Sequence, residues 1–341
     1  MPSARFVKYV AIALATQLLV GAALAGPGYD FDRHELESIL ADLKAWLPGQ
    51  WSSAPQVWYE RNVRMPAEGE HEHWHRTFAL IDAPQVGDVV FYGQINVGGS
   101  DGPLLPGSQI LYKAWIDPQR SVVAINGQGP VDPQRYADLH AHPELWHEVR
   151  MRDPDGIHCD FIWRRDGDQI VGVLDGKSDE YRKYGPGTCS YVSKRTNAEF
   201  MADAEWVLTP ETLWLYDLNM MGGRRMLGRK DHTHIRLYRA HPFRCHVRDA
   251  TGRHEFAAHD RGYTMPTSST AADTYRLTLL RAFFPGDDDH GLRDELRLQL
   301  AGKDAGAPQI TLASAAPAAG RIRARHENLS VDCRQLQSGK P

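Results

Sequence analysis

The chain has 341 residues, 42% of them hydrophobic and 24% charged, which is ordinary for a globular protein and enough for one large or two smaller domains. Its formal net charge of −4 at pH 7 gives no indication of a nucleic-acid partner, and none is predicted. It contains nine Trp, 13 Tyr and 10 Phe, which matter for function only if some of them line a cavity.

Residues 1–25 have the pattern of a secretory signal. Arg5 and Lys8 precede an apolar run at 10–24, and Ala23 and Ala25 form a small-x-small cleavage site. The run is short for a membrane span and no later segment approaches span length, so no membrane span is predicted. We therefore expect a mature chain that starts near Gly26 and is periplasmic or secreted.

One amphipathic helix is predicted at the start of the mature chain, in "DRHELESILADLKAWLPG". Asp32 can cap its first turn, and Pro48 with Gly49 ends it. This apolar stripe is wide enough to lie against a sheet or to close the end of a barrel. Its members recur at intervals of three and four residues: Leu36, Ile39, Leu40, Leu43, Trp46 and Leu47.

After this helix the hydrophobic period changes to two, which is typical of strands. The segment 157–176 reads as a hairpin with Asp166 and Gly167 at its turn, and 133–149 as a short helical excursion. Many short strands in sequence, without alternating helices, predict an antiparallel barrel or sandwich. The other predicted strand segments are 75–82, 88–97, 108–117, 121–127, 189–197, 202–218 and 233–241.

A second set of strands begins near residue 248, and we predict a domain boundary there. The first domain then spans 26–248, and the second, 249–341, is a small β-sandwich-like unit. It carries no recognisable chemical motif, so its expected role is contact with a protein partner. Its predicted strand segments are 249–263, 273–284, 294–302, 309–314 and 321–333.

Four cysteines are present: Cys159, Cys189, Cys245 and Cys333. An even number in an exported chain, with no C-x-x-C spacing, favours disulfides over metal ligation. Four cysteines allow three pairings. We expect Cys159–Cys189 and Cys245–Cys333, because each of these pairs falls within or brackets one predicted domain.

The stretch "HEHWH" at 71–75 fits the H-E-x-x-H pattern of zinc peptidases, with His71 and His75 as ligands and Glu72 as base. That chemistry requires a helix, because on a strand the two ligands would lie about 13 Å apart at roughly 3.3 Å per residue. The flanking residues predict a strand, so a zinc hydrolase is the least favoured function. Two alternatives remain: two histidines on one strand face share an ion with a third ligand, or all three line a solvent-facing edge while Trp74 and Phe78 point inward.

From residue 36 to 247 the chain resembles the CpcT/CpeT family of phycobiliprotein chromophore lyases. The similar segments, in the family's order, are "LKAWLPGQWSSAPQ", "VVFYGQ", "GSQILYKAW", "CDFIWRRDGDQIVGV", "YGPGTCSYV" and "HIRLYRAHPF". At Gly93, between Tyr92 and Gln94, family members usually carry an acidic residue. The resemblance implies a lipocalin-like antiparallel barrel closed by the N-terminal helix. It also implies an open-chain tetrapyrrole that is delivered to a protein cysteine.

Within that barrel, aromatic side chains would cover a flat ligand and a few polar groups would orient it. Gln56 and Gln94 are similar to polar family positions, and Arg224 and Arg225 could bind a carboxylate in a bidentate manner. The aromatic candidates, each of which could instead be ordinary core, are Tyr92, Tyr112, Trp163, Tyr191, Trp206, Trp214 and Tyr216.

The predicted function is an exported, lipocalin-like binding protein for a small, flat, apolar or anionic ligand. The alternatives are a bilin lyase, the zinc hydrolase, and a purely structural role, which would leave no cavity of ligand size in the barrel. No catalytic residue or metal ligand is assigned, and no cofactor is predicted beyond a tetrapyrrole-like ligand.

Overall fold

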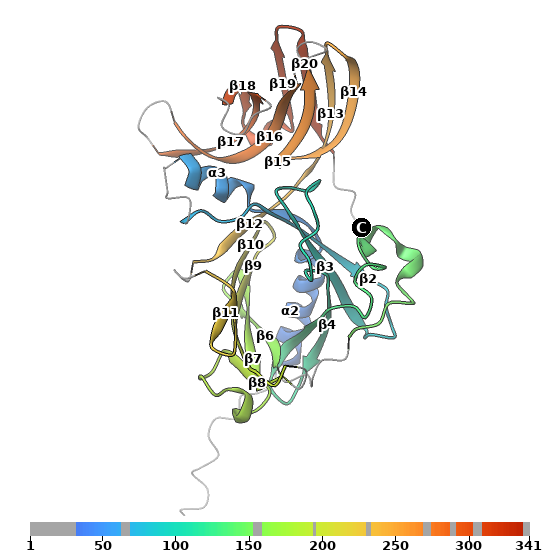
Figure 1. The fold of residues 1–341 in the computed structure, drawn as a ribbon, viewed down its shortest axis with the longest axis vertical. Helices are drawn as coiled ribbons and strands as arrows, with labels where there is room; N and C mark the ends of the chain where they lie inside the picture. Colours follow the sequence, from blue (N-terminus) through green and yellow to red (C-terminus); the bar gives the residue numbers. More distant parts are fainter. Residues whose placement is uncertain are drawn as a thin grey trace, which may run out of the picture.

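The computed structural model describes residues 32–62, 69–152, 159–193, 196–229, 233–268, 274–286, 291–302 and 309–336. The predicted signal segment lies outside these residues. The described chain is mainly β, with a closed antiparallel barrel and a smaller C-terminal β-sandwich, so the predicted fold class is confirmed. In Figure 1 the sandwich lies at the top and the barrel below it.

The predicted N-terminal helix is α2 (Arg33–Trp46). The Asp32 side chain accepts hydrogen bonds from the backbone N–H of His34 and Glu35, which satisfies two donors of the first turn. Lys44 near the last turn and Glu35 in the first complement the helix dipole. Leu36, Ile39 and Leu43 are buried on one face, as the apolar stripe predicts.

The barrel has ten strands that follow one another in sequence around the wall and pair antiparallel throughout, and the β9–β10 pairing closes it. Two further strands extend the wall beyond the closure: β8 (Thr188–Val192) pairs with β9, and β11 (Arg224–Leu227) pairs with β10. The barrel strands are β1 (Gly49–Ser52), β2 (Trp74–Ile81), β3 (Val89–Val97), β4 (Ile110–Asp117), β5 (Val122–Gln128), β6 (Cys159–Asp166), β7 (Gln169–Gly176), β9 (Glu199–Leu208), β10 (Thr212–Met221) and β12 (Ile235–Arg239).

Side chains of successive strand residues alternate between the interior and the outside of the barrel. The helix α2 contacts β4, β5 and β6, and it lies beside these strands in Figure 1. Its buried face packs with barrel residues and fills one end of the interior. We call this the filled end. The large side chains packed with the helix there are Trp51, Phe78, Phe91, Trp163, Leu208, Leu213 and Leu237.

Short helical segments cover the outside of the barrel. The predicted excursion at 133–149 contains two 3-10 turns, η2 (Leu139–Ala141) and η3 (Pro143–Leu145), which pack over the outer face of β3. Another 3-10 turn, η4 (Asp179–Tyr181), precedes β8. The helix α3 (Ala54–Asn62) follows β1 and was not predicted from the sequence.

The C-terminal unit consists of two four-stranded sheets, ordered β14-β13-β20-β19 and β15-β16-β17-β18, with a shared apolar core. The strand β13 spans the predicted boundary at 248 and pairs with β14 and β20, so the chain leaves the barrel before residue 242. The elements of this unit are β13 (Pro242–Asp249), β14 (Gly252–His259), β15 (Arg261–Ser268), β16 (Thr274–Pro285), β17 (Leu292–Gly302), β18 (Gln309–Ala315), η5 (Pro317–Ala319), β19 (Arg321–His326) and β20 (Leu329–Gln335).

Both predicted disulfides are present. Cys159–Cys189 joins β6 to β8 in the barrel, and Cys245–Cys333 joins the neighbouring strands β13 and β20 in the sandwich. Two disulfides indicate an oxidising compartment. Within the described part of the chain, no helix has the length and apolar character of a membrane span.

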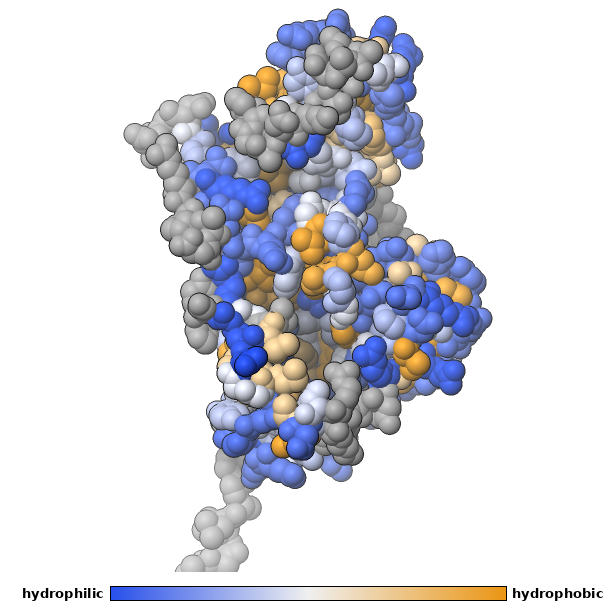
Figure 2. Space-filling view, in the orientation of Figure 1, coloured by the Kyte–Doolittle hydropathy of each residue, from blue (hydrophilic) through white to orange (hydrophobic). Residues whose placement is uncertain are grey.

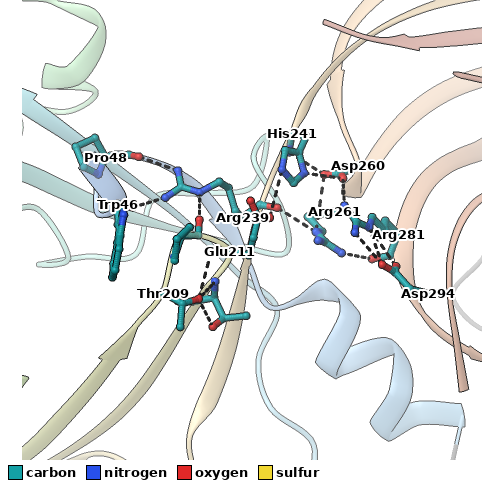
Figure 3. A network of polar contacts seen from close by, with 12 residues as sticks. Trp46, Pro48, Thr209, Glu211, Arg239, His241, Asp260, Arg261, Arg281 and Asp294 are labelled. Atoms are coloured by element: carbon teal, nitrogen blue, oxygen red, sulfur yellow. Dashed lines mark hydrogen bonds and ion pairs between the residues drawn. The ribbon is translucent and has the colours of Figure 1, made fainter. Parts of the chain in front are cut away.

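A polar network connects the barrel to the sandwich (Figure 3). Arg239 reaches the carbonyls of Trp46 and Pro48, which ties β12 to the end of α2. His241 lies 3.0 Å from Asp260 and 3.3 Å from Glu211, and the hydrogen bonds that its ring donates to both carboxylates raise the pKa of His241 to about 9. This histidine is therefore charged at neutral pH and bridges a barrel turn and the sandwich.

The helix α3 forms the apolar part of the same junction and lies between the two units in Figure 1. Ala54 and Trp58 pack against the sandwich residues Leu280, Ala282 and Phe284, with the Trp58 and Phe284 ring centroids 4.4 Å apart. The sandwich thus fixes the position of α3 on the barrel.

Candidate functional site

The other end of the barrel, which we call the hollow end, contains a cavity of about 900 Å3. Small-molecule pockets usually measure about 300–1,000 Å3, so a ligand of that class fits. The space-filling view shows hydrophobic side chains gathered over the middle of the molecule, between the sandwich and the lower barrel strands (Figure 2). The aromatic residues that line the cavity are Trp74, Tyr112, Phe161, Tyr191, Phe200, Trp206 and Tyr216.

A buried arginine forms the floor of this cavity. Arg76 on β2 is 6% exposed, and its guanidinium lies 4.6 Å from the ring centroids of both Phe78 and Trp206. One terminal nitrogen donates to the Tyr112 hydroxyl at 2.6 Å. Among the described residues no carboxylate lies within ion-pair distance of Arg76. A buried cation without an ion-pair partner attracts an anion, because it has lost its hydration and its nearest contacts are aromatic faces and a neutral oxygen.

Two buried N–H groups beside the cavity have no acceptor in the part of the chain that the structure describes. They are Nε of Arg76 and Nε1 of Trp206, both of which belong to cavity-lining residues. Buried donors are normally satisfied, so an unsatisfied pair marks a place where a ligand acceptor would be stabilised. A carboxylate could accept from these donors, whereas an entirely apolar ligand would leave both unpaired.

Asp217 on β10 is an acid that lines the cavity, as do Glu70 and Glu72. Burial, with a smaller contribution from Asp203, raises the pKa of Asp217 to about 6, against opposing effects of Arg76 and of the hydrogen bond from Asn219. The Asn219 amide donates to Asp217 at 3.0 Å. The carboxyl group is therefore close to half-protonated in mildly acidic solution and can donate or accept a proton there.

Glycines create room for the rings of the cavity floor. A Cβ atom at Gly93 would lie 2.9 Å from the Phe78 ring and 3.0 Å from Tyr112, and one at Gly127 would lie 3.0 Å from Tyr112. A larger residue at 93 would therefore displace these rings.

The nine predicted ligand-binding residues divide into three groups. Tyr112, Tyr191 and Trp206 line the barrel cavity together, as does the aromatic candidate Tyr216. Trp163 points inward but is packed in the filled end, 1% exposed. The remaining five lie elsewhere.

Tyr92 and Gln94 point away from the interior. Their side chains bond to each other at 2.7 Å and to the outer excursion, Tyr92 to the carbonyl of Tyr136 and Gln94 to Asp138. The reason is the strand register, which turns Phe91 and Gly93 inward and their neighbours outward.

Gln56, Arg224 and Arg225 are also outside the cavity. Gln56 lies on α3, where its amide bonds to the carbonyl of His234 and to the backbone N–H of Arg236. Both arginines are exposed on β11. The aromatic candidate Trp214 faces the outside of β10, with the Arg236 guanidinium 4.9 Å from its ring.

The "HEHWH" stretch is not helical, as predicted: residues 71–73 are irregular and β2 begins at Trp74. Each histidine has different neighbours. His71 bonds to Glu60, His73 lies 3.1 Å from the Ser52 hydroxyl, and His75 stacks on His259 of the sandwich at 4.8 Å. The expectation of a solvent-facing edge is wrong, because the sandwich and α3 cover this edge and bury His71 and His75. Among the described residues, no three His, Cys, Asp or Glu side chains are grouped to hold a metal.

Burial lowers the pKa of the histidines at this junction. It lowers the pKa of both His73 and His75 to about 4, with smaller contributions from Arg61 and His73 respectively, and the pKa of His259 falls well below its usual value. These rings are neutral at physiological pH, so they pack as aromatic groups at the junction.

Arg76 and Asp217 were not predicted. Side chains two residues apart on a strand point to the same face, and this rule could have found both. Arg76 lies two residues from Trp74 and from Phe78, and Asp217 lies two residues after Leu215. An ionisable residue on the apolar face of a strand is the signal that was available.

Comparison with known proteins adds no family assignment: no protein-family model matches the chain, and no curated protein matches its sequence.

Proposed function

We propose that this protein is an exported, lipocalin-like carrier that binds a small, flat, anionic ligand in the hollow end of its barrel. The observation that carries the proposal is the buried Arg76, stacked between two aromatic rings and without a carboxylate partner among the described residues. The cavity volume and the aromatic lining support a planar ligand. The two disulfides agree with export, and the resemblance to the CpcT/CpeT family suggests a tetrapyrrole-like compound.

The carboxylate of such a ligand would accept hydrogen bonds from Arg76 Nε and Trp206 Nε1, the two buried N–H groups of cavity-lining residues that have no acceptor in the described structure. Its planar body would lie among the rings of the cavity wall. Charge-assisted hydrogen bonds contribute about 1.5–3 kcal/mol each, so Arg76 should be the largest polar contributor to affinity.

Arg76→Met tests this proposal, because it keeps a long apolar stem while it removes the charge. We expect affinity for biliverdin and for 8-anilinonaphthalene-1-sulfonate to fall about 10- to 100-fold, from the loss of one charge-assisted bond. Binding is measured by probe absorbance and fluorescence titration of the purified full chain.

Arg225→Met is the matched control, since Arg225 is exposed on β11 and outside the cavity. It should change affinity less than twofold. Equal losses in the two variants, or no binding of either planar anion to the natural chain, would contradict the proposal.

A second candidate is bilin lyase activity, which the acid in the cavity favours. The raised pKa of Asp217 makes it a possible proton donor to a bound tetrapyrrole. Adding an acceptor protein with free cysteines to the biliverdin mixture separates the two functions. Covalent transfer that is lost in Asp217→Asn supports a lyase, and binding without transfer supports a carrier.

A further inference from the structure

A second cavity, of about 650 Å3, lies on the outside of the barrel, and we call it the outer groove. It is bordered by α3, by the outer faces of β10 and β12, and by Phe283 and Leu292 of the sandwich. His71, Arg229 and Thr233 line both the outer groove and the barrel cavity. These three side chains therefore form part of the wall between the two spaces.

The wall contains a directed chain of hydrogen bonds. Glu60 on α3 lies 2.7 Å from Nδ1 of His71, and its other oxygen accepts from the His71 backbone N–H at 2.8 Å. Nε2 of His71 lies 3.3 Å from the Thr233 hydroxyl. That hydroxyl oxygen also accepts a hydrogen bond from Nε of Arg229 at 3.1 Å.

The directions of these bonds follow from the chemistry of the partners. A carboxylate only accepts, so Nδ1 of His71 carries a proton, and in the neutral ring Nε2 is then the acceptor. The Gln56 amide nitrogen is also 3.1 Å from Nδ1, but the charged oxygen of Glu60 is closer and is the stronger partner. Arg229 donates to the Thr233 oxygen, and Nε2 of His71 lies within reach of the Thr233 hydroxyl as an acceptor for its proton.

Burial differs along this chain in a way that suits catalysis. Glu60 and His71 are 6% and 8% exposed, which protects the acid–histidine bond from water, whereas Thr233 is exposed. A buried carboxylate, a histidine in the acceptor tautomer and an accessible hydroxyl are the three parts of an activated nucleophile.

We propose that Glu60, His71 and Thr233 form a hydrolytic site for carboxylic esters that carry an aromatic or other flat apolar group. The Thr233 oxygen attacks the ester carbonyl carbon, and His71 Nε2 takes the hydroxyl proton. The bond from that carbon to the alcohol oxygen then breaks, and the alcohol leaves with the proton from His71. Water attacks the acyl-threonine with His71 as base, which releases the acid and returns a proton to the Thr233 oxygen.

The outer groove provides the substrate contacts. Exposed apolar side chains border it, Tyr59 and Trp214 on the barrel side and Phe283 with Leu292 on the sandwich. Arg236 lies over the Trp214 ring, so the groove offers an aromatic platform with a cation beside it. A flat acyl or alcohol group would rest there while its carbonyl reaches Thr233.

The two proposals are tested on different residues and with different measurements: Thr233→Val should abolish hydrolysis, whereas Arg76→Met should weaken planar-anion binding. Because Thr233 also lines the barrel cavity, planar-anion binding is not used to judge the hydrolytic site. Failure of one proposal therefore leaves the other standing.

The test measures hydrolysis of p-nitrophenyl acetate and p-nitrophenyl benzoate by the full chain, together with labelling by a fluorophosphonate. We expect Thr233→Val and His71→Gln to lose at least 100-fold in turnover, Glu60→Gln to lose about tenfold, and Thr233→Ser to stay within tenfold. The fluorophosphonate adduct should map to residue 233 in the natural chain and in Thr233→Ser.

Thr264→Val is the matched control, since Thr264 lies on β15 of the sandwich, away from the wall. It should retain full turnover. Because His71 and Glu60 are buried and their variants could unfold, the exposed Thr233 decides the outcome. Absence of the adduct at 233, or turnover that Thr233→Val leaves unchanged, overturns the proposal.

Discussion

The two ends of the barrel are built from the same strands and differ in what fills them. At the filled end, α2 inserts Leu36, Ile39 and Leu43 between the strands, and the interior is solid. At the hollow end the same inward positions carry aromatic rings, Arg76 and Asp217 around a cavity of about 900 Å3. This difference in packing indicates that the filled end contributes most of the barrel's stability and that the hollow end has room to bind a ligand.

The largest expected difference between the two ends is in the loss of stability when a leucine is shortened to alanine. Leu43→Ala in the filled end should lower the free energy of unfolding by about 2–5 kcal/mol, because the helix side chain is fully buried. Leu174→Ala in the cavity wall should cost less than about 1.5 kcal/mol, since that side chain already borders open space. All nine Trp lie between 46 and 214, so Trp fluorescence during denaturation follows the barrel. Equal losses would refute the division.

Replacing a glycine by alanine compares the two ends by overpacking, because each substitution adds a methyl group to the barrel interior. A Cβ at Gly172 would lie 2.5 Å from the buried Trp163 ring in the filled end, and Gly172→Ala should cost about 1–3 kcal/mol. Gly127→Ala meets Tyr112 at 3.0 Å, but that ring borders the cavity and has space to move, so the cost should stay below about 1 kcal/mol. Denaturation midpoints of the two variants check this, and a reversed order would mean that the hollow end is the rigid one.

The smallest expected effect concerns the pH dependence of binding at the hollow end. Asp217 is neutral below its pKa of about 6 and negative above it, so an anion should bind about tenfold more weakly at pH 8 than at pH 5. The sulfonate of 8-anilinonaphthalene-1-sulfonate keeps its charge over this range, so the change reports the protein. Asp217→Asn should bind with a nearly flat profile, and a natural chain with no pH dependence would show that Asp217 does not face the ligand.

The same carboxyl links pH to folding. Because its folded pKa lies above the ordinary value of 3.8, the native state holds a proton that the unfolded chain has already lost between about pH 4 and 6. Ionisation of Asp217 therefore lowers the stability of the ligand-free fold as the pH rises through that window.

Much of the architecture could be predicted from the sequence, because helix and strand periodicities are local. The stripe of α2, the hairpin of β6 and β7, and both disulfides are present as predicted, and the hairpin turn falls at Gly167 and Asp168, one residue after the predicted pair. The helix α3 was missed because it has nine residues, too few for a clear apolar period, and depends on packing against the sandwich.

The candidate site was predicted only in part. The errors arise from judging which alternate residues of a strand point into the barrel. In β3, the excursion at 133–149 covers the outer face, so Val90, Phe91 and Tyr92 are all buried. The strand sequence therefore lacks the apolar–polar alternation that would tell which side chains point into the barrel. Tyr92 and Gln94 were therefore placed on the wrong face. The wall chain of Glu60, His71 and Thr233 joins segments up to 173 positions apart, and no local spacing could reveal it.

The position of α3 has a consequence for any use of this barrel as a scaffold. One side of α3 is seated on the sandwich through Trp58, and the other holds His71 in place through Glu60. A barrel shortened after Arg239 would keep its ten strands and its internal chamber, yet the helix that orients His71 would have no support. The C-terminal unit thus supports a site that lies outside it, and an engineered protein that uses this barrel must keep both units.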